Sequence, residues 1–170
     1  MGEKDYESLS KIYRFATDFC NLADLPFHFK VDSGRRETII VFNLETGASR
    51  QPDPRENYDT LRYPEKDLVP DIADYSHKII IEYEEETGNK RSGAKLARKG
   101  HGHEGDNDGK RDSRRNECYE RADFKLLRIW ESNFKKSNTW KIVVTEFLID
   151  CWRKSLNDTM MVYSKVRNIE

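Results

Sequence analysis

A block of carboxylates stands at the end of an apolar run in this 170-residue chain. The stretch PDIADYSHKIIIEYEEE, residues 70–86, places Glu82 and Glu84 directly after three isoleucines, with Asp71 shortly before them. Residues two apart in a strand point to the same face, so Glu82 and Glu84 share one face of the predicted strand. Like charges this close cannot all stay ionised in a partly dry cleft unless a positive charge lies among them. The pattern therefore predicts a cation at this point.

A further carboxylate, Asp112, stands at the start of a predicted helix, with Arg115 and Tyr119 following on the same helical face. The hard cation Mg²⁺ binds oxygen ligands, typically one or two carboxylates, while waters and substrate phosphates fill the other positions. We therefore expect Mg²⁺, or Mn²⁺ in its place, among four converging acids: Asp71, Glu82, Glu84 and Asp112. The alternative is that residues 84–86 form a solvated strand end paired with Lys or Arg.

A basic, glycine-rich segment follows these acids at once. Residues 86–115 hold nine Lys or Arg, five Asp or Glu, and six of the nine glycines of the chain. Such a segment offers positive charge for a phosphate backbone beside the acid cluster, although a solvated linker is the alternative. The side chains expected to contact DNA phosphates are Lys90, Arg91, Lys95, Arg98, Lys99, Arg114 and Arg115.

These motifs resemble those of a known superfamily. Pro70-Asp71, followed by Glu82-Tyr83-Glu84 at the end of a buried strand, resembles the core of the PD-(D/E)XK nucleases, with Glu84 where the usual lysine stands. The stretch GKRDSRRNECYERADFKLLRIWES, residues 109–132, is similar to the very-short-patch repair endonucleases and the related homing endonucleases. Those enzymes carry an Arg-Asp at a helix start and a strand that ends in Trp-Glu. The resemblance covers about residues 68–134.

The resemblance implies a restriction-endonuclease-like α/β core, in which helices flank a mixed β-sheet. It implies a metal-dependent endodeoxyribonuclease that hydrolyses phosphodiester bonds in double-stranded DNA. The metal ligands that it implies are the carboxylates of Asp71 and Asp112 and the backbone carbonyl of Tyr83, with Glu82 or Glu84 as further catalytic carboxylates.

The resemblance also implies a catalytic histidine and a glutamate from the first helix. His103, or as second choice His101, stands in the stretch KGHGHEGDND and would accept or relay a proton, since imidazole titrates near neutral pH. The alternative is that both are loop histidines without a role. Glu7 is the candidate for the helix glutamate.

The chain also departs from the repair enzymes. Ser132 follows the Trp-Glu pair, and the sequence has no cluster of His and Cys zinc ligands there. A homing-type, mobile-element or phage nuclease is therefore favoured over mismatch repair. A junction resolvase stays open, as does a non-catalytic DNA-binding protein with a nuclease-like fold, which the missing motif lysine supports. A homodimer, or recognition domains on a longer chain, would lengthen the DNA target.

The hydrophobic spacing predicts the elements that must position these residues. It predicts an amphipathic helix over residues 4–22, a β-hairpin formed by FHFKV and ETIIVFNL around Gly34, and a surface loop over residues 46–63. KIIIEY and FKLLRIW predict buried strands, joined by a helix over residues 111–122. A last helix begins near Trp140. The order α-β-β-β-α-β-α predicts a mixed α/β sandwich.

Composition bounds the remaining possibilities. The length predicts one domain over residues 1–170, and 11% aromatic residues, with Trp130, Trp140 and Trp152 among them, supply a core. Charged residues make up 36% of the chain, but the net charge is only −1. Three widely spaced cysteines favour reduced thiols in an intracellular, cytoplasmic protein over structural zinc. No run has the length of a membrane span or the character of a signal peptide.

Overall fold

A four-stranded mixed sheet lies at the centre of the computed structural model, which describes residues 5–85 and 108–156, the side chains of residues 108–112 excepted. Its order is β1 (Lys30–Val31), β5 (Ile72–Asp74), β6 (Ile79–Glu84), β7 (Lys125–Trp130). The pairs β1–β5 and β5–β6 are antiparallel, and β6–β7 is parallel. The protein is therefore a mixed α/β fold, as the sequence predicted.

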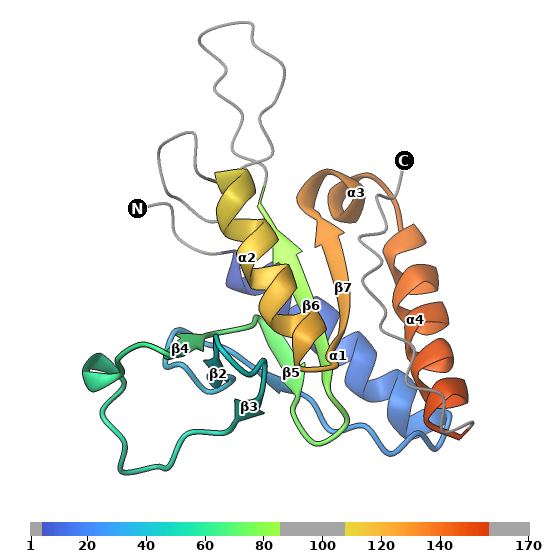
Figure 1. The fold of residues 1–170 in the computed structure, drawn as a ribbon. Helices are drawn as coiled ribbons and strands as arrows, with labels where there is room; N and C mark the ends of the chain where they lie inside the picture. The colour runs from blue at the N-terminus through green and yellow to red at the C-terminus, as the bar shows by residue number, and fades with distance from the viewer. Residues whose placement is uncertain (1–4, 86–107, 157–170) are drawn as a thin grey trace, which may run out of the picture.

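Helices cover both faces of this sheet (Figure 1). The helix α2 (Asp108–Arg121) connects the parallel strands β6 and β7, as a parallel pair requires a long crossover. On the other face lie α1 (Tyr6–Leu22) and α4 (Thr139–Leu156), with the short helix α3 (Glu131–Lys136) leading from β7 into α4. None of the helices within the described ranges combines the length and apolar character that a membrane span needs.

A second sheet of three strands lies beside the first (Figure 1). Its order is β3 (Ser49–Arg50), β2 (Ile40–Asn43), β4 (Glu65–Leu68), and the short 3₁₀ helix η1 (Tyr58–Thr60) stands in the loop between β3 and β4. The predicted hairpin around Gly34 is therefore wrong, because β1 pairs with β5 whereas β2 pairs with β3 and β4. The region predicted as a loop holds β3 and η1 as well as irregular chain.

The four-stranded sheet separates two apolar cores. On the α1 and α4 side, Ile79, Ile81 and Tyr83 of β6 are buried together with the inner faces of both helices. On the other side, Ile80 of β6 lies with residues of α2, β2 and β4. Alternation along β6 thus directs odd-numbered residues to one core and even-numbered residues to the other. Trp130 and Trp140 are buried, and Trp152 packs against the first core, in line with their predicted structural role.

All three cysteines are free thiols. Burial raises the pKa of Cys20 to about 11 and that of Cys151 to about 12. Burial also raises the pKa of Cys118, which is only partly covered. These thiols therefore stay protonated at neutral pH, where a protonated thiol is a weak nucleophile.

Candidate functional site

Three of the predicted carboxylates, those of Asp71, Glu82 and Glu84, lie on the α2 side of the sheet, near the C-terminal end of β6. Glu82 and Glu84 follow Ile80 in the alternation of β6, so they share a face, as predicted. The antiparallel register pairs Ile72 with Ile81, which places Asp71 next to Glu82 on the adjoining chain segment. All three carboxylates are buried, with exposures of 1% for Asp71, 1% for Glu82 and 2% for Glu84.

Asp71 is fixed by backbone donors and is linked to Glu82. One of its carboxylate oxygens accepts a hydrogen bond of 2.8 Å from the backbone N–H of Tyr83. Its own backbone N–H donates to Oε2 of Glu82 over 3.1 Å. These two bonds connect the β5 and β6 segments beyond their last paired residues. Asp71 and Glu82 are therefore in direct contact, through the backbone N–H of Asp71 and the carboxylate of Glu82.

Glu82 receives its positive charge from α2. Nη2 of Arg115 lies 2.7 Å from Oε1 of Glu82, and the hydroxyl of Tyr119 donates to the same oxygen over 2.9 Å. Burial and the Glu82 charge raise the pKa of Tyr119 well above its ordinary value, so the phenol stays a neutral donor. Burial lowers the pKa of Arg115, but its interactions with Tyr119 and Glu82 outweigh burial and raise it, so this guanidinium stays charged.

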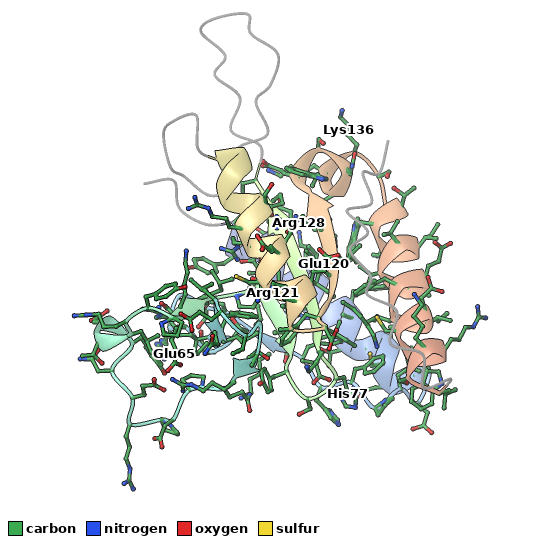
Figure 2. All side chains as sticks on the ribbon, in the orientation of Figure 1. Glu65, His77, Glu120, Arg121, Arg128 and Lys136 are labelled. Atoms are coloured by element: carbon green, nitrogen blue, oxygen red, sulfur yellow. The ribbon has the colours of Figure 1, made fainter. Side chains whose placement is uncertain are left out.

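Glu84 has a different arginine as its partner. Nη1 of Arg128, on β7, donates to Oε1 of Glu84, and both side chains are 3% exposed. Nη2 of the same guanidinium donates to the side-chain carbonyl of Asn116 on α2. Figure 2 labels Arg128 on the strand β7, beside α2. Glu84 is thus paired with an arginine, as the alternative reading expected, but it is buried and not solvated.

The arginines correct one part of the sequence interpretation. The cation that the acids were expected to face is supplied, for Glu82 and Glu84, by the guanidinium groups of Arg115 and Arg128. Arg115 was expected on DNA phosphates, but its spacing on the inner face of α2 directs it to Glu82, where its side chain is 17% exposed. Arg114, its neighbour on α2, is exposed to solvent as a phosphate contact requires.

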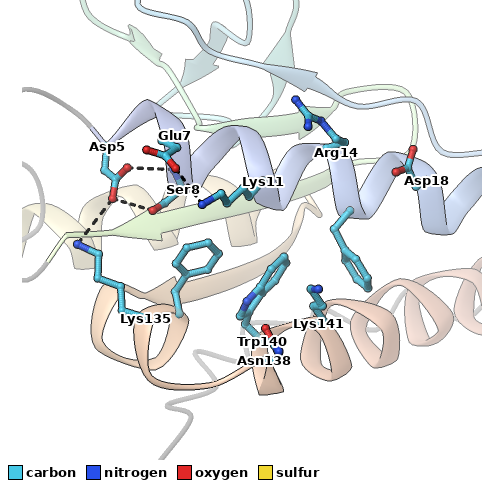
Figure 3. Close-up of a pocket in the computed structure, with 12 residues that line it drawn as sticks. Asp5, Glu7, Ser8, Lys11, Arg14, Asp18, Lys135, Asn138, Trp140 and Lys141 are labelled. Carbon is cyan, nitrogen blue, oxygen red and sulfur yellow. Dashed lines mark hydrogen bonds and ion pairs between the residues drawn. The ribbon is translucent and has the colours of Figure 1, made fainter.

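On the other face of the sheet, the start of α1 reaches the same end of β6. The backbone N–H of Asp5 donates to Glu85, and the hydroxyl of Tyr83 lies 3.4 Å from Oδ2 of Asp5. Figure 3 shows Asp5 with Ser8 and Lys135 at one end of a groove of about 690 Å³ between α1 and the segment joining α3 to α4. Lys135 lies 3.9 Å from Asp5 and also pairs with Glu131.

The acid that α1 brings to this end of the sheet is thus Asp5 and not the predicted Glu7. Glu7 lies on the outer side of α1, where its side chain is 81% exposed and forms an ion pair with Lys11 one turn later. Sequence reasoning missed Asp5, although an aspartate just before an amphipathic helix is a recognisable N-cap signal. That signal indicates the cap but not the contact with Tyr83.

Asp5 caps α1, which leads to a pH-dependent prediction. Its side chain accepts hydrogen bonds from the backbone N–H and the hydroxyl of Ser8. Burial raises the pKa of Asp5, but the bonds from Ser8 and the charge of Lys135 outweigh burial, so the pKa lies below the ordinary 3.8. A lowered carboxyl pKa stabilises the fold above the unfolded-state pKa, and that stability is lost as the pH falls through the folded-state pKa.

We therefore expect Asp5→Ala to lower the free energy of unfolding by about 1 kcal/mol at neutral pH, because the cap is lost. The difference from the wild type should shrink as the pH falls from the ordinary value of 3.8 through the lower folded-state pKa, where the wild-type carboxyl becomes protonated. Urea unfolding at a series of pH values measures both effects. Glu7→Ala, which removes an exposed helix acid, is the control and should change stability by less than about 0.5 kcal/mol at every pH. A difference between Asp5→Ala and the wild type that grows in acid would contradict this account.

Several predicted site residues lie outside the described part of the chain. These are His101, His103, Lys90, Arg91, Lys95, Arg98 and Lys99. Asp112 belongs to α2, one helical turn before Arg115, but its side chain is also outside the described set. The expected meeting of the Asp71 and Asp112 side chains therefore stays a prediction, whereas the bond from the Asp71 backbone to Glu82 is observed.

The donor set can be tested against the needs of a metal ion. Within residues 5–85 and 113–156, no group of three or more His, Cys, Asp or Glu side chains is arranged to hold one. Asp71 and Glu82 nevertheless lie next to each other, and Mg²⁺ usually takes only one or two carboxylates from the protein. Tyr83, the residue after Glu82 on β6, would add a backbone carbonyl. Two carboxylates and a carbonyl are donor types that Mg²⁺ or Mn²⁺ takes, so Asp71, Glu82 and Tyr83 fit such an ion by their chemistry. Glu82 and Glu84 are, however, both buried and each already paired with an arginine.

Comparison of the chain with protein-family models, with curated proteins and with solved structures gave no match.

Proposed function

We propose that this protein is a metal-dependent endodeoxyribonuclease with a restriction-endonuclease-like core, and that it hydrolyses phosphodiester bonds in double-stranded DNA. The observation that supports the proposal most is the adjacency of Asp71 and Glu82 on the hairpin of β5 and β6. They are linked by the 3.1 Å bond from the Asp71 backbone to Glu82, directly after Pro70. If the PD-(D/E)XK resemblance holds, these two residues would form part of the metal site.

Asp71, Glu82 and the carbonyl of Tyr83 would hold Mg²⁺ or Mn²⁺, with Asp112 as the second aspartate that the resemblance implies. A bound ion supplies charge stabilisation at a phosphoryl oxygen and lowers the pKa of a coordinated water. The chain's own residues orient the carboxylates, because Arg115 and Tyr119 fix one oxygen of Glu82. His103 would accept or relay the proton.

Phosphate contacts complete the proposed site. Arg114 is exposed on α2, the helix that crosses above the carboxylates. The basic residues of the preceding segment would add further contacts, and each phosphate neutralised should steepen the salt dependence of binding by about 0.9 in a log–log plot. Among nucleases we favour a homing-type, mobile-element or phage enzyme that acts inside a cell. It would recognise its DNA as a homodimer or with recognition domains on a longer chain.

A second candidate is a DNA-binding protein that has this fold but no catalytic activity. One observation favours it: Glu82 and Glu84 each have an arginine partner inside the protein, so these two charges are balanced without a metal. The usual motif lysine is also replaced by Glu84, whose side chain is buried. A junction resolvase would also be a metal-dependent endodeoxyribonuclease, but its preferred substrate would be branched DNA.

A metal titration on plasmid DNA separates these functions. We expect the protein to nick or linearise supercoiled plasmid in Mg²⁺ or Mn²⁺ and to stop cutting when EDTA removes the metal, because the carboxylates alone cannot activate water. Gel electrophoresis measures cutting, and an electrophoretic shift in EDTA measures binding. Binding that is equal in metal and EDTA, with no cutting in either, would support the non-catalytic candidate instead. Faster cutting of a four-way junction than of linear duplex would identify a resolvase.

A further inference from the structure

The connection between the two sheets, residues 32–38, is attached at both ends to the backbone that carries Asp71. At its start, the backbone N–H of Asp32 donates to the carbonyl of Asp71 over 2.8 Å. At its end, the hydroxyl of Thr38 donates to the carbonyl of Pro70. We call residues 32–38 the Arg35 turn, since Arg35 stands at its middle. Both ends of the turn are thus hydrogen-bonded to the Pro70-Asp71 segment.

The strand directions place this turn at the carboxylate end of the sheet. β1 runs antiparallel to β5, and β5 runs antiparallel to β6, so the end of β1 and the end of β6 lie at the same edge. The Arg35 turn follows β1 directly, whereas Glu84 closes β6. Arg35 is three residues from each end of the turn, and three residues extend the chain by at most about 10 Å. Arg35 is therefore held near Asp71.

Internal hydrogen bonds fix the shape of the turn. The buried carboxylate of Asp32 accepts from the backbone N–H groups of Gly34, over 3.2 Å, and Arg36, over 2.9 Å. The carboxylate of Glu37 accepts from the N–H groups of Ser33, over 3.0 Å, and Arg35, over 3.3 Å. Ser33 also lowers the pKa of Glu37 to about 2 through its hydroxyl, so this acceptor stays ionised at neutral pH. The backbone is thus held before any substrate binds.

Two backbone angles and one close approach add to this rigidity. Gly34 has a φ of 92° and Arg36 a φ of 62°, which are left-handed values that most residues avoid. A Cβ atom at Gly34 would lie 2.8 Å from the hydroxyl of Tyr6, at the start of α1. Glycine is therefore favoured at this position by its backbone conformation, and a larger residue would also displace the Tyr6 side chain.

The two arginines of the turn have different surroundings. Arg36 forms an ion pair with Asp67 of β4, and its guanidinium lies 5.2 Å from the ring centre of Tyr58. Arg35 is exposed, and within the described residues it forms no ion pair. A rigid backbone thus carries one exposed arginine, which forms no ion pair with the described residues, close to the Pro70-Asp71 segment.

We propose that Arg35 binds a backbone phosphate of the DNA strand that passes Asp71, and that the Arg35 turn positions this strand for cutting. The inference rests on the proposed function. A guanidinium suits a phosphate because its planar N–H groups match two phosphate oxygens. The fixed turn determines where the phosphate lies, since backbone contacts set the register of a duplex without reading its sequence.

The test compares Arg35→Ala with Arg55→Ala, a matched control that removes another exposed arginine, from the loop between β3 and η1. A fluorescein-labelled duplex is titrated in EDTA, so that no cutting occurs, across a range of salt concentrations. We expect Arg35→Ala to weaken binding about fivefold and to reduce the log–log salt slope by about 0.9, the value for one phosphate. Arg55→Ala should match the wild type in both measurements. Cutting of plasmid in Mg²⁺ should fall at least in proportion to binding for Arg35→Ala.

A second variant tests position separately from charge. Gly34→Ala keeps Arg35 but forces the turn to change, so it too should weaken binding, while circular dichroism reports a folded protein. If Arg35→Ala binds duplex with the wild-type affinity and salt slope, this inference is wrong and the proposed function is unaffected. The same conclusion follows if Arg55→Ala loses as much affinity as Arg35→Ala does. No binding of duplex by the wild type would overturn the proposed function itself.

Discussion

Replacing Asp71 with asparagine should abolish DNA cutting while DNA binding is retained. Asparagine keeps the size of the side chain and one acceptor oxygen for the backbone N–H of Tyr83, which Asp71 accepts over 2.8 Å. It removes the negative charge that a divalent ion needs. Metal-based charge stabilisation is worth several kcal/mol, and each 1.36 kcal/mol is a factor of ten, so we expect a loss of about a thousandfold in cutting rate.

The measurement is the initial rate of plasmid nicking in Mg²⁺, with binding followed in EDTA. Asp59→Asn, a change of the same kind at an exposed position in η1, is the control and should cut at the wild-type rate. Circular dichroism of both variants checks that the fold is kept. Binding by Asp71→Asn should equal or exceed that of the wild type, because a negative charge near the phosphates is gone. A nicking rate within tenfold of the wild type would exclude Asp71 as a metal ligand.

Replacing Arg128 with methionine should be the most destabilising single change at this site. Arg128 and Glu84 are each 3% exposed, so neither can exchange its partner for water. Removing one member of a buried pair leaves the other charge uncompensated and typically costs about 3–5 kcal/mol. The side-chain carbonyl of Asn116 also loses its donor. Urea unfolding followed by tryptophan fluorescence measures the loss.

The double variant Glu84→Leu with Arg128→Met should recover most of this stability. Apolar side chains in place of both members of a buried ion pair are often neutral or stabilising. Arg55→Met, at an exposed position, is the control and should change stability by less than about 0.5 kcal/mol. Exposed ion pairs contribute at most about 1 kcal/mol. If Arg128→Met lowers the free energy of unfolding by less than about 1 kcal/mol, the ion pair of Arg128 and Glu84 is therefore not buried in the way described.

The double variant also answers a question about the chemistry. A folded double variant that cuts DNA at the wild-type rate would show that Glu84 is structural. A folded double variant that binds DNA but has stopped cutting would place Glu84 among the catalytic carboxylates, as the sequence motif suggested. The buried pairing of Glu84 leads us to expect the first result.

The parts of the fold that the sequence predicted are those with local causes. The α1 prediction rested on apolar residues repeating at helical spacing, and the β6 prediction on three adjacent β-branched residues. The shared face of Glu82 and Glu84 followed from the two-residue period of a strand. Each of these patterns depends only on neighbours in the chain, so one sequence was sufficient.

The errors concern partners that are distant in the sequence. The residues that flank Gly34 do not indicate that β1 pairs with β5 while β2 joins another sheet. Arg128 could not be assigned to Glu84 either, since the contact depends on the parallel register of β6 and β7. Arg115 lay within a basic run, and its charge favoured a phosphate contact over the inward position that its helical spacing gives it.

The way the second sheet joins the first also bears on how such a protein can diversify. Residues 33–70 leave the central sheet after β1 and return to it before β5, and the two crossing points are one hydrogen bond apart, from Asp32 to Asp71. Insertions or deletions in the outer loops of this segment should therefore leave the pairing of β1 with β5 and of β5 with β6 unchanged, provided that β2 and β4 still pack on Ile80 and α2. The strands that carry Asp71 and Glu82 could in this way keep their register while the outer loops of residues 33–70 vary in length and sequence.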